Sequence, residues 1–275
     1  MREGLTYIDV KPTITASSQH IGPFHQDDVL FDWTEVRIPA GVGRLVGLSA
    51  NMRGVNGAAQ SKEFDVYFSK SNTFSLGTLN SGVDLQPNND LLGAASILSS
   101  HYMNGLNHME VANMTTSNRV TVPSIEITGA PKTQGTHRIY IAGVAQAAGI
   151  DFSTNALTDA AVDVSGLSVP TFTTLDGTSL LSVFGPGDII HAYNPVAAAS
   201  VICGEVTTLD ANNITFRADG AIQYSNGGLP LYTAPRNFTF WQVQNGVGGA
   251  GDLEDTAELY NVHPITLKLS FAYES

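Results

Sequence analysis

Hydrophobic and polar residues alternate along much of this chain, and the alternation predicts β-strands. The clearest case is residues 265–273, where Ile265, Leu267, Leu269 and Phe271 share one face and mostly polar residues share the other. A strand of this kind has one side on a core and one side toward solvent, as in an antiparallel sandwich. Similar strand patterns cover residues 7–15, 44–52, 63–69, 120–128 and 136–144.

The predicted strand that contains Trp33 changes its phase part of the way along. Phe31 and Trp33 alternate on odd positions, whereas Val36 and Ile38 alternate on even ones. An extra residue in one strand would produce this switch, so we expect a β-bulge near Thr34. Because Trp33 is in phase with Phe31, we expect it to lie in the core.

Helical periodicity is weak throughout the chain. The best candidates are residues 89–98 and 255–260, and both predict single helical turns within loops. A stretch rich in Asn, Gly and Ser runs from residue 70 to about 118. It is too long for a simple connection, so we expect an excursion with local structure. The chain is therefore predicted to be all-β.

Residues 147–235 differ in charge from the rest of the sequence. They hold one basic residue, Arg217, against eight acidic residues, and so carry −7 of the net charge of −12. Strand patterns at 188–193, 200–207 and 214–217 are typical of a small β-barrel. The long final strand needs partners, which the first part of the chain would supply most easily. We therefore predict that this acidic region is a domain inserted into the first domain.

The predicted fold is an antiparallel, jelly-roll-like β-sandwich with an inserted small β-barrel. The sandwich takes residues 1–146 and 262–275, the acidic barrel takes 147–236, and 237–261 is a connecting segment.

Composition excludes several classes of protein. The chain has 13 basic and 25 acidic residues without a Lys/Arg cluster, so we expect no nucleic-acid partner. No signal region or membrane-length apolar run is present, which predicts a soluble protein made in a cytoplasm without a membrane partner. The single cysteine, Cys203, allows no intrachain disulfide and is expected to be a small buried residue.

Candidate metal sites are sparse. His20, His25, Asp27 and Asp28 bring nitrogen and oxygen donors close together in sequence, a donor set that could hold a divalent ion. Their spacing fits a solvated turn better. The same holds for the pair His101 and His108.

Two further loops are candidate ligand-binding sites. Residues 84–90 lack the spacing of a calcium loop, and the Gly-rich segment 248–255 ends in three carboxylates that disfavour phosphate. No Gly-x-Ser-x-Gly nucleophile motif is present. We therefore predict no catalytic residue, metal or cofactor, and a protein that is not an enzyme.

Carbohydrate recognition would need exposed aromatic side chains on a concave face. The two tryptophans and nine tyrosines are the candidates. Since Trp33 is predicted to be core, Trp241 is the aromatic residue that we expect to face a glycan.

Several short blocks carry a family resemblance. They are YIDV at 7–10, TITAS at 13–17, DVLFDWTEV at 28–36, FDVYF at 64–68, SLGT at 75–78, IYIAGVA at 139–145 and TLKLSF at 266–271. With these blocks, residues 1–146 and 262–275 resemble virion structural proteins of tailed bacteriophages, especially marine and aquatic ones. In such proteins the last two blocks lie close together. Here about 120 residues separate them, which supports the insertion.

The resemblance implies a capsid decoration, or cement, protein on the virion surface, made in the host cytoplasm. Its partners would be the major capsid protein and copies of itself, with a homotrimer favoured. The first ten residues would form an arm, in which Tyr7, Ile8, Asp9 and Val10 contact the capsid. Alternatives are a tail, collar or fibre component and a host-glycan binding module or hydrolase.

Overall fold

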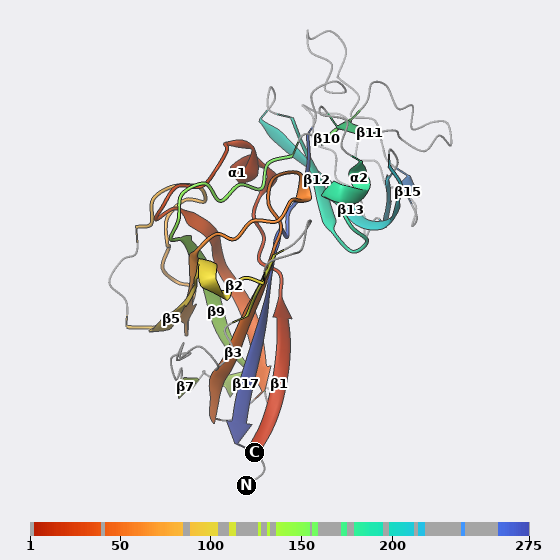
Figure 1. Ribbon diagram of the computed structural model, residues 1–275. Coiled ribbons are helices and arrows are strands. Elements are labelled where there is room, and N and C mark those ends of the chain that lie inside the picture. The colour runs from red at the N-terminus through yellow and green to blue at the C-terminus, as the bar shows by residue number, and fades with distance from the viewer. Residues whose placement is uncertain are drawn as a thin grey trace, which may run out of the picture.

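The structure is a computed structural model (Figure 1). It describes residues 3–39, 42–84, 89–103, 110–113, 126–127, 131–132, 136–154, 156–158, 172–174, 179–194, 198–211, 214–217, 238–239 and 258–274. Within these ranges antiparallel strands predominate and helices are few and short. The prediction of an all-β, sandwich-like fold is confirmed.

Two sheets make up the sandwich. The first sheet has the order β1 (Glu3–Val10), β17 (Ile265–Glu274), β3 (Val42–Met52) and β6 (Glu110–Asn113), with β7 (Glu126–Ile127) also on β3. The second has the order β2 (Val29–Pro39), β9 (Thr136–Ala145), β4 (Phe64–Ser69) and β5 (Leu91–Ile97), with β8 (Pro131–Lys132) also on β9. The C-terminal strand β17 thus lies between β1 and β3.

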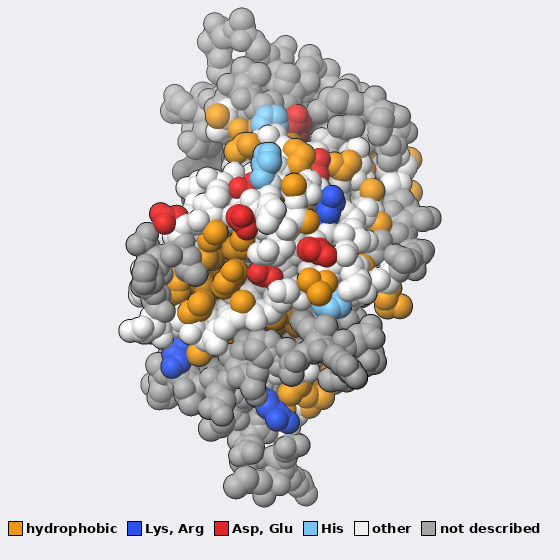
Figure 2. Space-filling model, turned by 60° about the vertical axis from the view of Figure 1, so that its left-hand side comes forward, with side chains coloured by type: hydrophobic (Ala, Val, Ile, Leu, Met, Phe, Trp, Pro, Cys, Tyr) orange, Lys and Arg blue, Asp and Glu red, His pale blue; other side chains and the backbone are white. Residues whose placement is uncertain are grey.

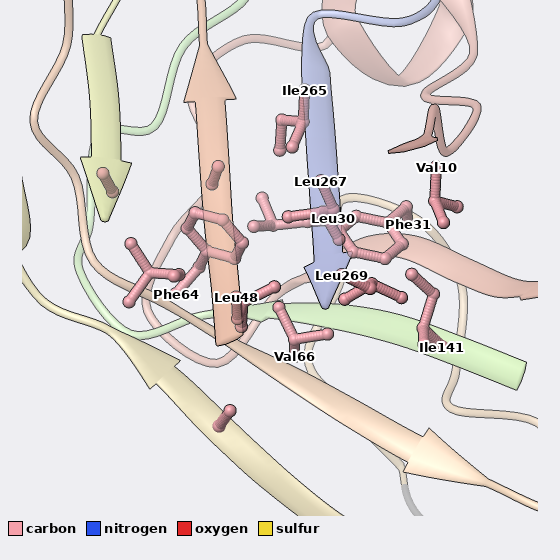
Figure 3. Close-up of a cluster of buried hydrophobic side chains, with 14 of the residues drawn as sticks. Val10, Leu30, Phe31, Leu48, Phe64, Val66, Ile141, Ile265, Leu267 and Leu269 are labelled. Carbon is pink, nitrogen blue, oxygen red and sulfur yellow. The ribbon is translucent and has the colours of Figure 1, made fainter. Parts of the chain in front are cut away.

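Alternating side chains from both sheets form one core. The predicted inward face of β17, represented by Leu267 and Leu269, is fully buried against Val66 and Ile141 of the second sheet (Figure 3). Burial of this kind removes apolar surface from water at roughly 25 cal/mol per Å². The period-two pattern therefore fixes which face of each strand packs inward.

The predicted irregularity in β2 is present. Its register with β9 shifts between Val29 and Phe31 and again between Phe31 and Thr34. Phe31 points into the sandwich core, where Gly143 of β9 makes room for its ring. Trp33 is not in that core. It lies on the outer face of the second sheet, where it is half-buried and packs against a cluster that contains Val29. Its Nε1 donates to the Phe74 carbonyl at 2.8 Å.

A third sheet comes from the chain between β9 and β17. Its order is β11 (Phe172–Thr174), β10 (Ala156–Thr158), β16 (Glu258–Asn261), β12 (Ile189–Asn194), β13 (Ala199–Leu209), β14 (Ile214–Arg217) and β15 (Phe238–Thr239). Among the described strands no pairing joins β11 to β15, so closure into a barrel stays a prediction. The sheet sits at one end of the sandwich (Figure 1).

The structure corrects three expectations about individual elements. Helical turns were expected at residues 89–98 and 255–260, but strands β5 (Leu91–Ile97) and β16 (Glu258–Asn261) lie there because neighbouring strands pair with them. The segment 237–261 is more than a connection, since it supplies β15 and β16 to the third sheet. The first strand covers Glu3–Val10 and is followed by helix α1 (Ala16–His20), which the alternation did not indicate.

Candidate functional site

The open edge of strand β1 is the most distinctive surface of the sandwich. β1 pairs along its whole length with β17, from Glu3 opposite Glu274 to Val10 opposite Leu267. No described strand pairs with its other edge. Alternate backbone amides and carbonyls of an edge strand are left without ladder partners, so this edge offers main-chain hydrogen bonds to another chain.

The side chains of β1 divide between the core and solvent. Val10 is buried and Ile8 is half-buried against the core. Leu5 and Tyr7 point the other way, with 52% and 70% of their surface exposed, and Asp9 is exposed beside them. Two large apolar or aromatic side chains therefore project from the outer face next to the open edge.

The outer face beside β1 combines small side chains with two exposed cations, Lys268 opposite Asp9 and Arg44 opposite Ala272. Leu5 lies opposite Ala272 and Tyr7 lies opposite Ser270 on β17. Gly47 of β3 follows as the partner of Ser270, and a Cβ added there would come within 3.3 Å of the serine side chain. The small residues next to Tyr7 leave its ring accessible, and the tyrosine supplies a large contact area.

Strand β1 has fewer of the devices that usually protect an edge, although Asp9 places one exposed charge on it. Between Glu3 and Val10 the sequence has no Lys, Arg or Pro, and the pairing with β17 has no register shift. β2, which ends the second sheet, has two register shifts, the exposed charges Asp32 and Arg37, and a final proline. Since natural proteins guard free edges in these ways, the less guarded β1 edge is suited to being covered by a partner.

The expected N-terminal arm needs correction. Tyr7, Ile8, Asp9 and Val10 are part of the sandwich rather than a free segment, because the ladder to β17 holds all four. The Val10 side chain is 6% exposed and belongs to the core, so at this residue only the backbone edge is open to a partner. Contact with another protein stays a prediction for the exposed Tyr7 and Asp9. The exposed side chain of Leu5 was not predicted as a contact residue, although Leu5 lies two residues before Tyr7 and therefore on the same face of the strand.

A polar clamp joins helix α1 to the third sheet. The helix begins after Thr15, whose hydroxyl accepts a hydrogen bond from the Ser18 amide. At its last residue, His20 Nδ1 lies 2.7 Å from Glu258 Oε2 on β16, and the Tyr260 hydroxyl donates to the same carboxylate. Burial, followed by the hydrogen bond to Glu258 and its charge, raises the pKa of Tyr260.

An ion pair also joins the sandwich to the third-sheet region. Arg53, just after β3, donates from Nη1 to Asp188 Oδ2 at 2.5 Å, just before β12. The same oxygen accepts from the Gly185 amide at 2.8 Å. Burial raises the pKa of the Asp188 carboxyl, and the arginine charge opposes that rise most strongly. This contact was also missed, because residues 135 positions apart leave no shared local pattern.

The predicted histidine cluster is dispersed. His20 belongs to the clamp, whereas the His25 side chain is 84% exposed and lies 3.5 Å from Asp28. Asp28 is buried and accepts a hydrogen bond from the His25 amide, so it shapes the turn. His101 is buried and accepts from the Leu98 amide. In the described ranges no group of three or more His, Cys, Asp or Glu side chains could hold a metal ion.

Several other sequence candidates lie outside the described residues. These are Trp241, His108, residues 85–88 and residues 248–255; Cys203 is placed in β13, but its side chain is not among those described. The glycan-facing role of Trp241 accordingly stays a prediction.

The described surface has no strongly basic face in the view of Figure 2, where acidic and basic side chains lie singly among polar and hydrophobic ones. Within the described part of the chain, no helix is both long and apolar enough to cross a bilayer. No protein-family model matches the sequence, and no curated protein matches it. The open edge of β1, with Leu5 and Tyr7 exposed beside it, is therefore the feature from which a function can be proposed.

Proposed function

We propose that this chain is a structural component of a tailed-phage virion, which decorates the capsid and stabilises it by binding the lattice of major capsid protein. The observation that carries the proposal is the open, less guarded edge of β1 with Leu5 and Tyr7 exposed beside it. An edge of this kind is a hazard in a free protein and an advantage in one that is covered on assembly. The resemblance of the sandwich blocks to phage structural proteins supports the same function.

The mode of binding follows from the chemistry of the edge. An extended segment of a capsid subunit adds to β1 as a further strand and takes up its free amides and carbonyls. Tyr7 and Leu5 then provide apolar contact area at the centre of the interface, where aromatic residues contribute most.

Stabilisation of the shell follows by mass action. A protein that binds the assembled lattice and not its free subunits shifts the equilibrium toward the assembled state. A symmetric oligomer, for which we favour a trimer, makes several weak contacts at once and gains avidity from them. The third sheet, at one end of the sandwich, projects away from the shell or bridges neighbouring copies.

Two measurements test the proposal. Purified protein is added to capsids from which it has been stripped, and cosedimentation is measured; failure to bind contradicts the proposal. Imaging of the virion then locates the chain. Density repeated over the shell supports decoration, whereas density at one vertex or along the tail assigns the chain to a tail, collar or fibre instead.

A further inference from the structure

A polar pocket lies where the sandwich meets the third-sheet region. It has a volume of about 90 Å³. A water molecule occupies roughly 10–15 Å³ of such space, so the pocket holds several waters or one small ion. We call it the junction pocket, and the lining residues that matter are Lys11, Asn51, Arg53, Asp188, His263 and Thr266.

The charge in the junction pocket is opposite in sign to that of the whole chain. Lys11 and Arg53 are two of only 13 basic residues in a protein of net charge −12, and the imidazole of His263 lines the same space. The one carboxylate among the lining residues, Asp188, already accepts hydrogen bonds from Arg53 and from the Gly185 amide. With that carboxylate neutralised by Arg53, the lysine leaves the pocket with a net positive charge.

Most of the polar groups that remain are hydrogen-bond donors. Within the described part of the chain, the side chains of Lys11, Asn51 and Thr266 form no hydrogen bond or ion pair. Lysine is a donor only, and amide and hydroxyl groups can donate as well. The His263 ring donates from Nδ1 to the Pro12 carbonyl oxygen at 3.0 Å, so in the neutral ring Nε2 is an acceptor and the donors come from the other lining residues.

We infer that the junction pocket binds one small oxyanion of the size of phosphate, held by Lys11 with help from Arg53, Asn51 and Thr266. A tetrahedral oxyanion offers only acceptors, which matches a pocket rich in donors, and charge-assisted bonds of this type are about twice as strong as neutral ones. Anion binding at the junction pocket does not require the protein to be part of a virion.

Binding has a structural consequence. Lys11, Asn51 and Thr266 belong to the sandwich side of the pocket, whereas Asp188 comes from the third-sheet region. An anion bound between them stabilises the native arrangement of the two parts, because any ligand that binds only the folded state raises its stability.

The test uses the full chain and inorganic phosphate, titrated at constant ionic strength with chloride as the balancing ion. Backbone amide NMR shifts near Asn51 and Gly187 should saturate, and the melting temperature should rise with phosphate. Lys11→Met should weaken phosphate binding at least about tenfold, as expected for loss of one charged hydrogen bond.

The matched control is Lys70→Met, at an exposed lysine just after β4 of the other sheet, which should leave phosphate binding unchanged. Absence of saturable shifts, or equal weakening by both variants, overturns the inference. Circular dichroism of Lys11→Met checks that the fold is kept, and if it is not, Thr266→Val takes its place with the same expected loss.

Discussion

At the scale of single residues, one glycine determines how the irregular part of β2 packs. Phe31 turns into the core beside β9, where Gly143 lies opposite it in the ladder. A Cβ added to Gly143 would lie 2.2 Å from the Phe31 ring. Real carbon atoms do not approach so closely, so a side chain at this position would displace the ring from a fully buried site.

Replacing Gly143 with alanine should therefore destabilise the protein. Overpacking of a filled core costs about 1–3 kcal/mol, and we expect Gly143→Ala to lower the free energy of unfolding by this amount. Urea denaturation followed by circular dichroism measures the change.

Gly82→Ala is the matched control, because a Cβ at that glycine meets no atom within 4 Å. It should change the free energy of unfolding by less than about 0.5 kcal/mol. Equal stabilities of the two variants would show that Phe31 does not fill the space beside Gly143.

A single histidine should make stability depend on pH. Burial, with a smaller contribution from the charge of His263, lowers the pKa of His191 to about 4. Below pH 6.5 the unfolded chain takes up a proton that the folded chain refuses. The free energy of unfolding is therefore undiminished by His191 above pH 6.5. It falls by about 2–3 kcal/mol as the pH drops from 6.5 toward 4.

The check is the free energy of unfolding measured between pH 7 and pH 4 for the wild type and for His191→Gln. Glutamine cannot take up a proton, so the variant should lose about 2–3 kcal/mol less over this range. Superimposable pH profiles would assign the acid sensitivity to other groups.

At the scale of the element, β1 shows that one strand can serve both a core and a surface. Ile8 and Val10 anchor it to the sandwich, while Leu5 and Tyr7 stand on the outer face beside the open edge. Since outward side chains contribute little to the core, the exposed pair can change without loss of the fold.

The double variant Leu5→Lys, Tyr7→Lys tests this division. Lysines on an edge strand oppose the addition of another strand, so binding to stripped capsids should fall at least about tenfold while the free energy of unfolding changes by less than about 1 kcal/mol. Cosedimentation and urea denaturation measure the two effects. Leu181→Lys, at another exposed leucine on helix α2 (Leu180–Val183), should bind as the wild type does.

At the scale of the whole molecule, a few long-range contacts hold the third sheet against the sandwich. Gln19 of α1 donates to the carbonyls of Ile14 and Asn261, both at 2.8 Å. Gly57 packs so closely against helix α2 that an added Cβ would lie 2.3 Å from the Ser182 carbonyl oxygen. The Arg53–Asp188 pair completes this junction.

Loss of Arg53 should be costly because it leaves a carboxylate without its cation. Asp188 has 14% of its side chain exposed, and burial raises its pKa already in the presence of the arginine. We expect Arg53→Met to lower the free energy of unfolding by about 3 kcal/mol. Differential scanning calorimetry measures the loss.

Arg37→Met provides a comparison at the surface. Arg37 pairs with Glu35 at 3.0 Å, but 78% of its side chain is exposed. Exposed pairs contribute about 0–1 kcal/mol, so this variant should stay close to the wild type. If both arginine variants lose the same stability, the Arg53–Asp188 pair does not hold the two parts together.

The sequence by itself determined the properties that depend on neighbouring residues. Period-two alternation located β3, β4, β9 and β17 and assigned the inward face of β17, because successive side chains of a strand point to opposite sides. The change of phase around Thr34 located the irregularity in β2 for the same reason.

Tertiary structure alone decided what depends on distant partners. The short segments at β5 and β16 became strands because a neighbour pairs with them. Trp33 lies on the outer face, where it contacts Phe74, because the register shift between Phe31 and Thr34 breaks its phase with Phe31. The clamp from His20 to Glu258 and the junction pocket join residues more than 200 positions apart. No local pattern encodes such contacts, since they arise only when the core of the sandwich brings the two ends of the chain together.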